Sequence, residues 1–391
     1  LDGRGAGVSI RDISRRVDEY LVKSVRLQNA TVGKTATASD YAARTQLLFG
    51  TPGSANSVPN FMSTFFNSLQ SLAQTPESAT MRLNAVNSGN SLAREIRGLA
   101  QGLQDLRLQA EQDISASIGT INRILTDLKG LNKAVSGDLL LGKSVADLLD
   151  RRDGFLKELS EYLDITTYTR GNGEVNVFTG SGLSLLDDSL YQISYKSQAS
   201  VSAFIADAPL GAIEVYRLND NGERVGDPNY LATGGPSSQV TNTVVNGKLR
   251  ALLDMRDRQA PSMLAQLDRL AYNFRNSFNT MHNKGVGFPG ANSYLSARAI
   301  NAEDFSLWTG KTRIALMGGD GLPVPSLYGD EVSGIRPITI DLSKLDTGSG
   351  PGYPSVQGII NEINQHYGPP GNKVELGNLN NIRLTSDVAS L

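Results

Sequence analysis

The chain has no cysteine, only two histidines and a single tryptophan among its 391 residues. Without cysteine there can be no disulfide, thiol catalysis or cysteine–zinc site, so stability must come from packing and assembly. His282 and His366 are the only imidazoles, and the sequence gives neither a nucleophile nor an orienting acid. Trp308 alone cannot form a stacking platform for bases. We therefore expect no cofactor and no metal site.

Charge of one sign and long apolar runs are also scarce. Lys and Arg total 37 against 39 Asp and Glu, a formal net charge of -2, so nothing draws the chain to nucleic acid or to an anionic membrane. No run is apolar enough to span a bilayer, and no secretory signal opens the chain. Because the sequence starts at Leu1 rather than Met, we expect the natural N-terminus to lie upstream. The length predicts two to three domains.

The chain does have one long apolar stripe, between Leu92 and Val135. Its apolar residues recur in steps of three and four without proline, which is typical of a helix with one buried seam, here about 65 Å long. A second seam with the same spacing follows at 249–281, and we expect the two to pack side by side. The predicted packing residues are Leu92, Ile96, Leu99, Leu103, Leu106, Ile114, Ile118, Ile121, Leu125, Leu128, Leu253, Met263, Leu267, Leu270, Phe274 and Phe278.

Helical and β patterns alternate along the rest of the chain. We expect Thr75-Pro76-Glu77 to cap and begin the long helix, and Pro261 to lie near the start of a new helix. The predicted helices and strands are helices over 1–49, 61–72, 145–163, 247–284 and 355–366, and strands at 165–169, 175–178, 191–195, 213–218, 312–317, 337–342, 373–376 and 383–384. The predicted class is α+β multidomain: a long, coiled-coil-like helix bundle with inserted and appended antiparallel β domains. The predicted division is a discontinuous helical rod domain (1–162 with 246–285), a β-hairpin-rich region (163–245) and a mainly β outer domain (286–391).

Gly137–Ser144 matches the phosphate-binding pattern G-x-x-x-x-G-K-[ST] letter for letter. A phosphate loop must follow a buried strand, whereas this segment follows a long helix and carries three leucines. No later strand ends in a convincing magnesium-binding Asp. We favour a helix–helix connector with a helix-capping Ser144, and keep a P-loop nucleotide-binding protein as the alternative. Asp187-Asp188 and Asp220–Glu223 miss the calcium-loop spacing and indicate turns.

Several segments resemble the hook-associated protein 1 family of the bacterial flagellum, which forms the hook–filament junction. Phe61 to Leu72 is similar to its Phe-Phe-x-x-Leu-x-x-Leu segment, and Asp147–Asp153 to its Asp-Leu-Leu-Asp-x-Arg-Asp segment. Asn172–Val177 matches the hairpin that follows, while Gly247–Asp254 and Gln266–Gly285 resemble the returning helix. The resemblance covers 1–285 and is weak over 286–391.

The resemblance implies a structural axial protein without enzymatic activity, located outside the cell at the hook–filament junction. It implies type III export without a cleaved signal peptide. The implied partners are the hook protein, the neighbouring junction protein, copies of the chain itself in the assembled ring, and an export chaperone at the terminal region. It also implies flanking terminal helices, so we expect this chain to be a monomeric core lacking them. Hook, rod and filament proteins, and a binding module built on the β regions, stay open as alternatives.

Overall fold

The computed structural model describes residues 18–51, 53–198, 210–233 and 243–282, and the backbone of five short strands between 293 and 385. By its internal contacts the chain divides into two compact units, Leu1–Asn67 with Val86–Ala271 and Ser68–Ala85 with Tyr272–Leu391. The first unit holds most of α3, the first part of the returning helix and the middle β region. The three-part division expected from the sequence stays a prediction.

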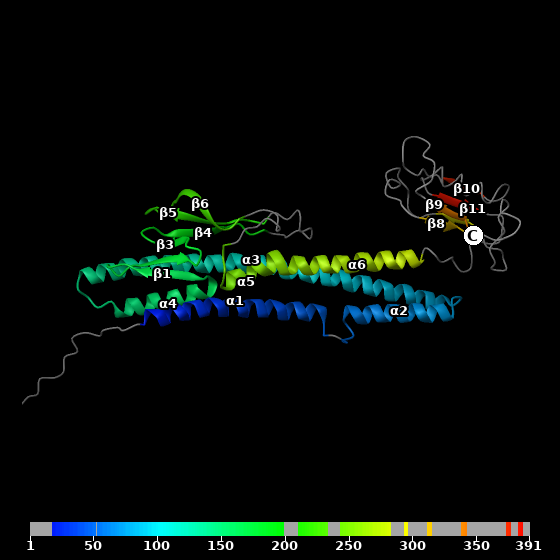
Figure 1. Ribbon diagram of the computed structural model, residues 1–391, viewed down its shortest axis with the longest axis horizontal. Coiled ribbons are helices and arrows are strands. Elements are labelled where there is room, and N and C mark those ends of the chain that lie inside the picture. The colour runs from blue at the N-terminus through cyan, green and yellow to red at the C-terminus, as the bar shows by residue number, and fades with distance from the viewer. Residues whose placement is uncertain are drawn as a thin grey trace, which may run out of the picture. The chain divides into compact units, whose positions relative to one another are not determined.

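The N-terminal part of the chain forms α1 (Glu19–Phe49), α2 (Val58–Gln74), α3 (Ala79–Leu140) and α4 (Ala146–Tyr162), as Figure 1 shows. α3 has 62 residues, which at the α-helical rise corresponds to a length of about 93 Å. The predicted cap of this helix is wrong: the Ser78 hydroxyl accepts the Met81 amide at 3.4 Å. The Thr75 amide instead donates to the Leu72 carbonyl at 3.2 Å, at the end of α2. Ser78 can accept from an amide three residues ahead and so begins α3.

The returning helix is interrupted soon after it begins. α5 (Lys248–Asp254) passes into the π-helical segment η1 (Met255–Gln259), and α6 (Ala260–His282) continues from it. Pro261 is the second residue of α6, but α6 follows α5 and η1 without a break, so the proline lies inside a helical run and the prediction that it lies near the start of a new helix is wrong. The π-helical segment was not predicted, because hydrophobic periodicity does not resolve a local change of hydrogen-bond register.

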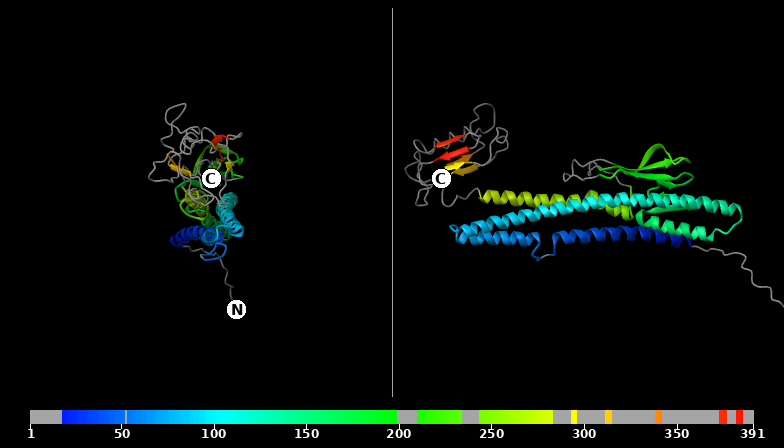
Figure 2. Two further views of the ribbon diagram at one scale, coloured as in Figure 1. Left: turned by 90° about the vertical axis from the view of Figure 1, so that its right-hand side faces the viewer. Right: turned by 180° about the vertical axis from the view of Figure 1, so that it is seen from behind.

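Antiparallel sheets complete the described fold, and the predicted α+β class is confirmed. One sheet has the order β1 (Ile165–Thr169), β2 (Val175–Thr179), β3 (Ser184–Leu186), and the next has the order β4 (Tyr191–Tyr195), β5 (Ile213–Leu218), β6 (Arg224–Ala232). Both lie beside α3 in the right-hand view of Figure 2, and side chains of α3 hydrogen-bond to each of them. In the second unit the strands are β7 (Ser293–Leu295), β8 (Lys311–Ile314), β9 (Ile338–Asp341), β10 (Lys373–Leu376) and β11 (Ile382–Thr385), paired as β10-β11-β7 and β8-β9. The helix predicted at 355–366, His366 and Trp308 lie outside the described residues.

Two glycines allow the backbones of the first unit to approach closely. A Cβ on Gly33 in α1 would lie 2.2 Å from the Glu161 carbonyl oxygen of α4. A Cβ on Gly247, where φ is +88°, would lie 2.4 Å from the Tyr162 carbonyl oxygen. Only glycine fits contacts this short. The core beside them joins buried side chains of α1, α3, α4, α5 and both sheets, among them Tyr41, Ile121, Leu159, Val215 and Leu252.

Candidate packing site

The predicted seam residues differ in how far the structure buries them. Those with exposed fractions below a tenth are Leu92, Leu99, Leu103, Ile114, Ile118, Ile121, Leu125, Leu128, Leu253 and Leu267. Ile96, Leu106, Met263, Phe274 and Phe278 are half-buried, and Leu270 is 38% exposed. Phe274 and Phe278 stack with ring centroids 6.4 Å apart, and the Phe278 ring stacks on His282 at the end of α6. The role of this seam in packing stays a prediction.

The α3 seam also carries buried charged side chains, which the apolar periodicity of the sequence does not reveal. Arg107 and Glu111 of α3 and Arg256 of η1 all have exposed fractions of 0%. The Arg256 guanidinium donates to the Glu111 carboxylate at 2.9 Å and to the Tyr195 hydroxyl at 2.5 Å. The other Glu111 oxygen accepts the Gln198 amide at 2.8 Å. This buried cluster therefore connects α3, η1 and the end of β4.

Electrostatics favour the charged form of Arg256 in this cluster. Burial opposes the charge on Arg256, but the hydrogen bond and field of the Asp257 carboxylate outweigh it, and the pKa of Arg256 is raised. Burial also raises the pKa of the Asp257 carboxyl, with Arg256 opposing that shift. The pKa of the Tyr195 hydroxyl is raised by burial. Removing one partner of a buried, hydrogen-bonded pair costs roughly 3–5 kcal/mol, because the other charge is left buried and uncompensated.

Arg107 completes the hydrogen bonding of the π-helical segment. There the Ala260 amide donates to the Met255 carbonyl, five residues back. In the same register the Arg256 carbonyl would need the amide of residue 261, which is Pro261 and has no N–H. The Arg107 Nε donates to that carbonyl instead, at 2.8 Å. A proline and an arginine 154 positions apart in the sequence (261 − 107) are thus coupled through one carbonyl oxygen.

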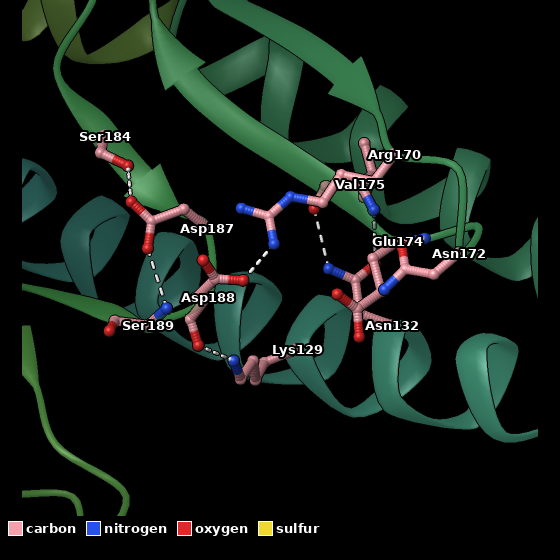
Figure 3. Close-up of polar contacts among 10 residues, drawn as sticks. All are labelled: Lys129, Asn132, Arg170, Asn172, Glu174, Val175, Ser184, Asp187, Asp188 and Ser189. Atoms are coloured by element: carbon pink, nitrogen blue, oxygen red, sulfur yellow. Dashed lines mark hydrogen bonds and ion pairs between the residues drawn. The ribbon is translucent and has the colours of Figure 1, made fainter.

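Two asparagines of α3 bind the backbone of the sheets. The Asn132 side-chain amide donates to the Val175 carbonyl at 2.8 Å and accepts the Val175 amide at 3.0 Å, so it pairs with β2 as a strand residue would (Figure 3). Asn122 pairs in the same way with Ile193, at 2.8 and 2.9 Å. Ile193 lies on β4, an edge strand. Helix side chains therefore occupy backbone groups that a further strand would use.

A polar group beside Asn132 ties the β1–β2 hairpin to the turn after β3. Figure 3 shows Asp188 between Arg170, which binds its carboxylate, and Lys129, which binds its carbonyl. The hydrogen bond from Arg170 lowers the pKa of Asp188. Asp187 accepts the Ser184 hydroxyl at 2.6 Å and the Ser189 amide at 2.8 Å. Both carboxylates thus serve a turn, as expected for Asp187-Asp188.

The Gly137–Ser144 segment ends a helix. The Lys143 amide donates to the Asp138 carbonyl at 2.9 Å, and the Gly142 amide donates to the Leu139 carbonyl at 3.1 Å. Gly142 has φ +66°, so the three observations define the left-handed helix ending known as a Schellman motif. The amides that would cradle a phosphate are used within the helix end. The expected cap by Ser144 is wrong, since Val145 precedes α4 and no side chain caps it.

In the described part of the chain, no three or more acidic or histidine side chains gather closely enough to hold a metal ion. Nor does any helix among those residues have the length and apolar character needed to cross a bilayer. What the geometry provides is a long helix with sheets fixed to it by buried polar contacts, an arrangement suited to holding shape.

The comparisons with known proteins agree on one family. The family model described as the flagellar hook-associated protein FlgK helical domain matches residues 42–294. Flagellar hook-associated protein 1 of Salmonella typhimurium is 24% identical over 295 residues, covering 73% of this chain and 48% of that protein. The Bacillus subtilis protein of the same name is 24% identical over 294 residues, covering 72% of this chain and 56% of that protein. The chain spans about half the length of these relatives.

A solved structure has the same fold. The flagellar hook junction protein FlgK from Burkholderia pseudomallei aligns with a TM-score of 0.55 at 20% identity, covering 77% of this chain and 51% of that one. The matched range of the family model includes α2, α3, α4, both sheets of the first unit and the returning helix. On this evidence the chain belongs to the FlgK family of flagellar hook-associated proteins.

Proposed function

We propose that this protein is a structural subunit of the bacterial flagellum that joins hook to filament by packing against neighbouring axial subunits, without enzymatic activity. The observation that supports this most is the family match over 42–294, which coincides with the helical framework. A rod whose sheets are fixed by Asn122 and Asn132 and whose returning helix is fixed by Arg107 and Arg256 would transmit force between neighbours without changing shape.

Partners and location follow from this proposal. The partners are the hook protein, the neighbouring junction protein and further copies of the chain, all outside the cell. The route is export through the flagellar type III apparatus without a cleaved signal, assisted by a chaperone that binds terminal segments of the longer protein. The apolar seams and the absence of a strong net charge support assembly by packing rather than by charge attraction.

Gene deletion in the bacterium that encodes this chain tests the proposal against its rivals. A junction protein should leave hooks intact but without filaments, and filament subunits should appear in the medium. Electron microscopy and blotting of the medium measure both, and the wild-type gene should restore filaments. Loss of the hooks as well would identify a hook or rod protein, and filaments that still grow on hooks would contradict a junction role.

A nucleotide-binding function has less support, because the Schellman motif at Lys143 uses the amides that a phosphate would need. Calorimetric titration with ATP and Mg²⁺ tests it, with Lys143→Ala as the control. We expect no saturable binding by either protein. Micromolar binding that the substitution abolishes would restore the P-loop alternative.

A further inference from the structure

The chain carries three Asn-Gly pairs, a dipeptide that favours tight turns and is also chemically reactive. They are Asn172-Gly173, Asn221-Gly222 and Asn246-Gly247, and all three glycines have φ between +79° and +88°. Glycine adopts this backbone without strain, which is why the pair is typical of tight turns. Because glycine has no side chain, its amide nitrogen is also unhindered and can attack the side-chain amide of the asparagine before it.

The reaction that such a pair permits needs only water. The deprotonated glycine nitrogen attacks Cγ of the asparagine, so that a C–N bond forms and the bond from Cγ to the side-chain nitrogen breaks. The side-chain nitrogen leaves as ammonia, after taking up the proton that the backbone nitrogen gave to solvent. Water then opens the cyclic imide at either carbonyl and gives aspartate or isoaspartate, in which the main chain runs through Cβ and Cγ. The net change is one water consumed, one ammonia released and one new carboxylate.

Asn221 lies in the exposed turn between β5 and β6, together with Asp220, Gly222 and Glu223. In the part of the chain that the structure describes, no hydrogen bond reaches the Asn221 side chain. A Cβ on Gly222 would meet nothing within 4 Å beyond its chain neighbours. The Gly222 amide donates only locally, to the Asn219 carbonyl at 2.9 Å. The turn can therefore open, and free this amide, without disturbing the core.

Asn172 begins the same tripeptide as Asn221, Asn-Gly-Glu, but the structure holds it in place. Its side-chain oxygen accepts the Glu174 amide at 3.2 Å (Figure 3). The Gly173 carbonyl accepts the guanidinium of the buried Arg152 at 3.2 Å. A Cβ on Gly173 would lie 2.6 Å from the Leu139 side chain, so this turn is packed on the end of α3. Opening it would break that packing and these hydrogen bonds as well as the turn itself.

Asn246 is held on both sides of the reacting bond. Its side-chain amide donates to the Thr31 hydroxyl at 3.0 Å. The Gly247 amide, which would have to attack, donates to the Ala30 carbonyl at 3.1 Å. Both acceptors belong to α1, and Gly247 is buried where α5 begins. The amide is therefore not free to turn toward Asn246 unless α1 and α5 separate.

We propose that Asn221 is a site of spontaneous deamidation in the folded protein, and that the other two Asn-Gly pairs are protected by their contacts. The product places a new carboxylate between Asp220 and Glu223 on an exposed turn. Isoaspartate also lengthens the main chain there, next to the cross-strand pair of Leu218 and Arg224, and so loosens the end of the β5–β6 ladder. The reaction needs no partner, so the site does not depend on the proposed flagellar role.

Ageing the purified full chain at mildly alkaline pH tests the proposal, with peptide mass spectrometry to measure conversion at each asparagine. In the folded chain Asn221 should convert at least about tenfold faster than Asn172, because only its turn opens easily. In concentrated guanidinium chloride the two rates should agree within about twofold, because the unfolded chain leaves only the shared tripeptide. Equal rates in the folded chain, or an intact Asn221 where the unfolded chain reacts, would overturn the proposal. A difference that persists in guanidinium chloride would also overturn it, since the cause would then be the local sequence.

Two matched variants give a second readout, because the new carboxylate makes the aged chain separable by anion exchange. Asn221→Gln keeps an amide but forms the cyclic imide poorly, and it should lower the acidic fraction at least about fivefold. Asn172→Gln makes the same change on the protected turn and should alter that fraction less than about twofold. Circular dichroism establishes that both variants fold. An acidic fraction that Asn221→Gln leaves unchanged, or that both variants lower equally, would mean that Asn221 is not the site.

Discussion

At the scale of single residues, Arg107 and Pro261 are coupled through the Arg256 carbonyl. Pro261 has no backbone N–H to donate to that carbonyl, and the Arg107 side chain donates in its place. Arg107→Met should lower the free energy of unfolding by about 3 kcal/mol, since the buried Arg256 carbonyl loses its donor and the ion cluster loses a member. In a Pro261→Ala background the new amide can reach that carbonyl, so the same change should cost at least about 1 kcal/mol less. Urea unfolding of the four proteins measures the cycle. Penalties that add within about 0.5 kcal/mol would show that the two residues act independently.

Asp164 is a second residue whose environment has a measurable consequence. Burial raises the pKa of its carboxyl, although the Asn246 amide donates to it at 3.4 Å. Because the folded pKa lies above the unfolded one, the folded state binds the proton more tightly, and this group adds stability as pH falls through the folded pKa. Asp164→Asn keeps an acceptor without the charge. It should be more stable than wild type near pH 7 by less than about 1 kcal/mol, allowing for solvent screening of a half-buried group.

The difference between the two proteins should shrink as pH falls through the folded pKa of Asp164. Thermal unfolding from about pH 7 to about pH 4 measures it, and the comparison cancels the titration of every other carboxylate. A variant that is less stable than wild type at neutral pH would mean that the charged carboxylate is favourable in the folded state. A constant difference across the range would mean that folding leaves the pKa of Asp164 unshifted.

At the scale of elements, the β1–β2 hairpin is held to α3 by Asn132. Asn132→Leu should leave the buried amide and carbonyl of Val175 unpaired, at a cost of about 2–4 kcal/mol. Hydrogen exchange at the Val175 amide should accelerate strongly, while exchange in β5 should change little. Asn172→Ala removes only the exposed bond to the Glu174 amide and should cost less than about 1 kcal/mol. Unchanged protection at Val175 in the Leu variant would argue against the clamp.

Apolar periodicity predicted the helices and strands well, but it did not predict the polar contacts that hold them together. The strands β4 and β5 have the predicted bounds, and α2, α4 and the first hairpin begin and end within a few residues of expectation. Turn residues and apolar spacing are local signals, so one sequence contains them. Asn122, Arg107 and Glu111 are polar residues on a mostly apolar stripe, and their partners lie 71, 149 and 145 residues away. A single sequence does not pair positions so distant. The apolar spacing gave no signal for these residues, since the steps of four continue through Leu106, Ala110 and Ile114.

At the scale of the whole molecule, the charges are few and balanced, and we propose that subunits assemble by packing rather than by charge attraction. Such an assembly should respond to salt differently from one held by ion pairs. The association of the purified chain should change less than twofold between about 50 mM and about 500 mM NaCl. The Debye length shortens over this range, so an assembly held by charge attraction would weaken, whereas one held by apolar packing would not. Sodium sulfate should strengthen association, because it is excluded from apolar surface. Sedimentation at fixed protein concentration measures both series. Association that weakens tenfold in NaCl would identify a contact between charged residues, because salt screens charge attraction and leaves apolar packing in place.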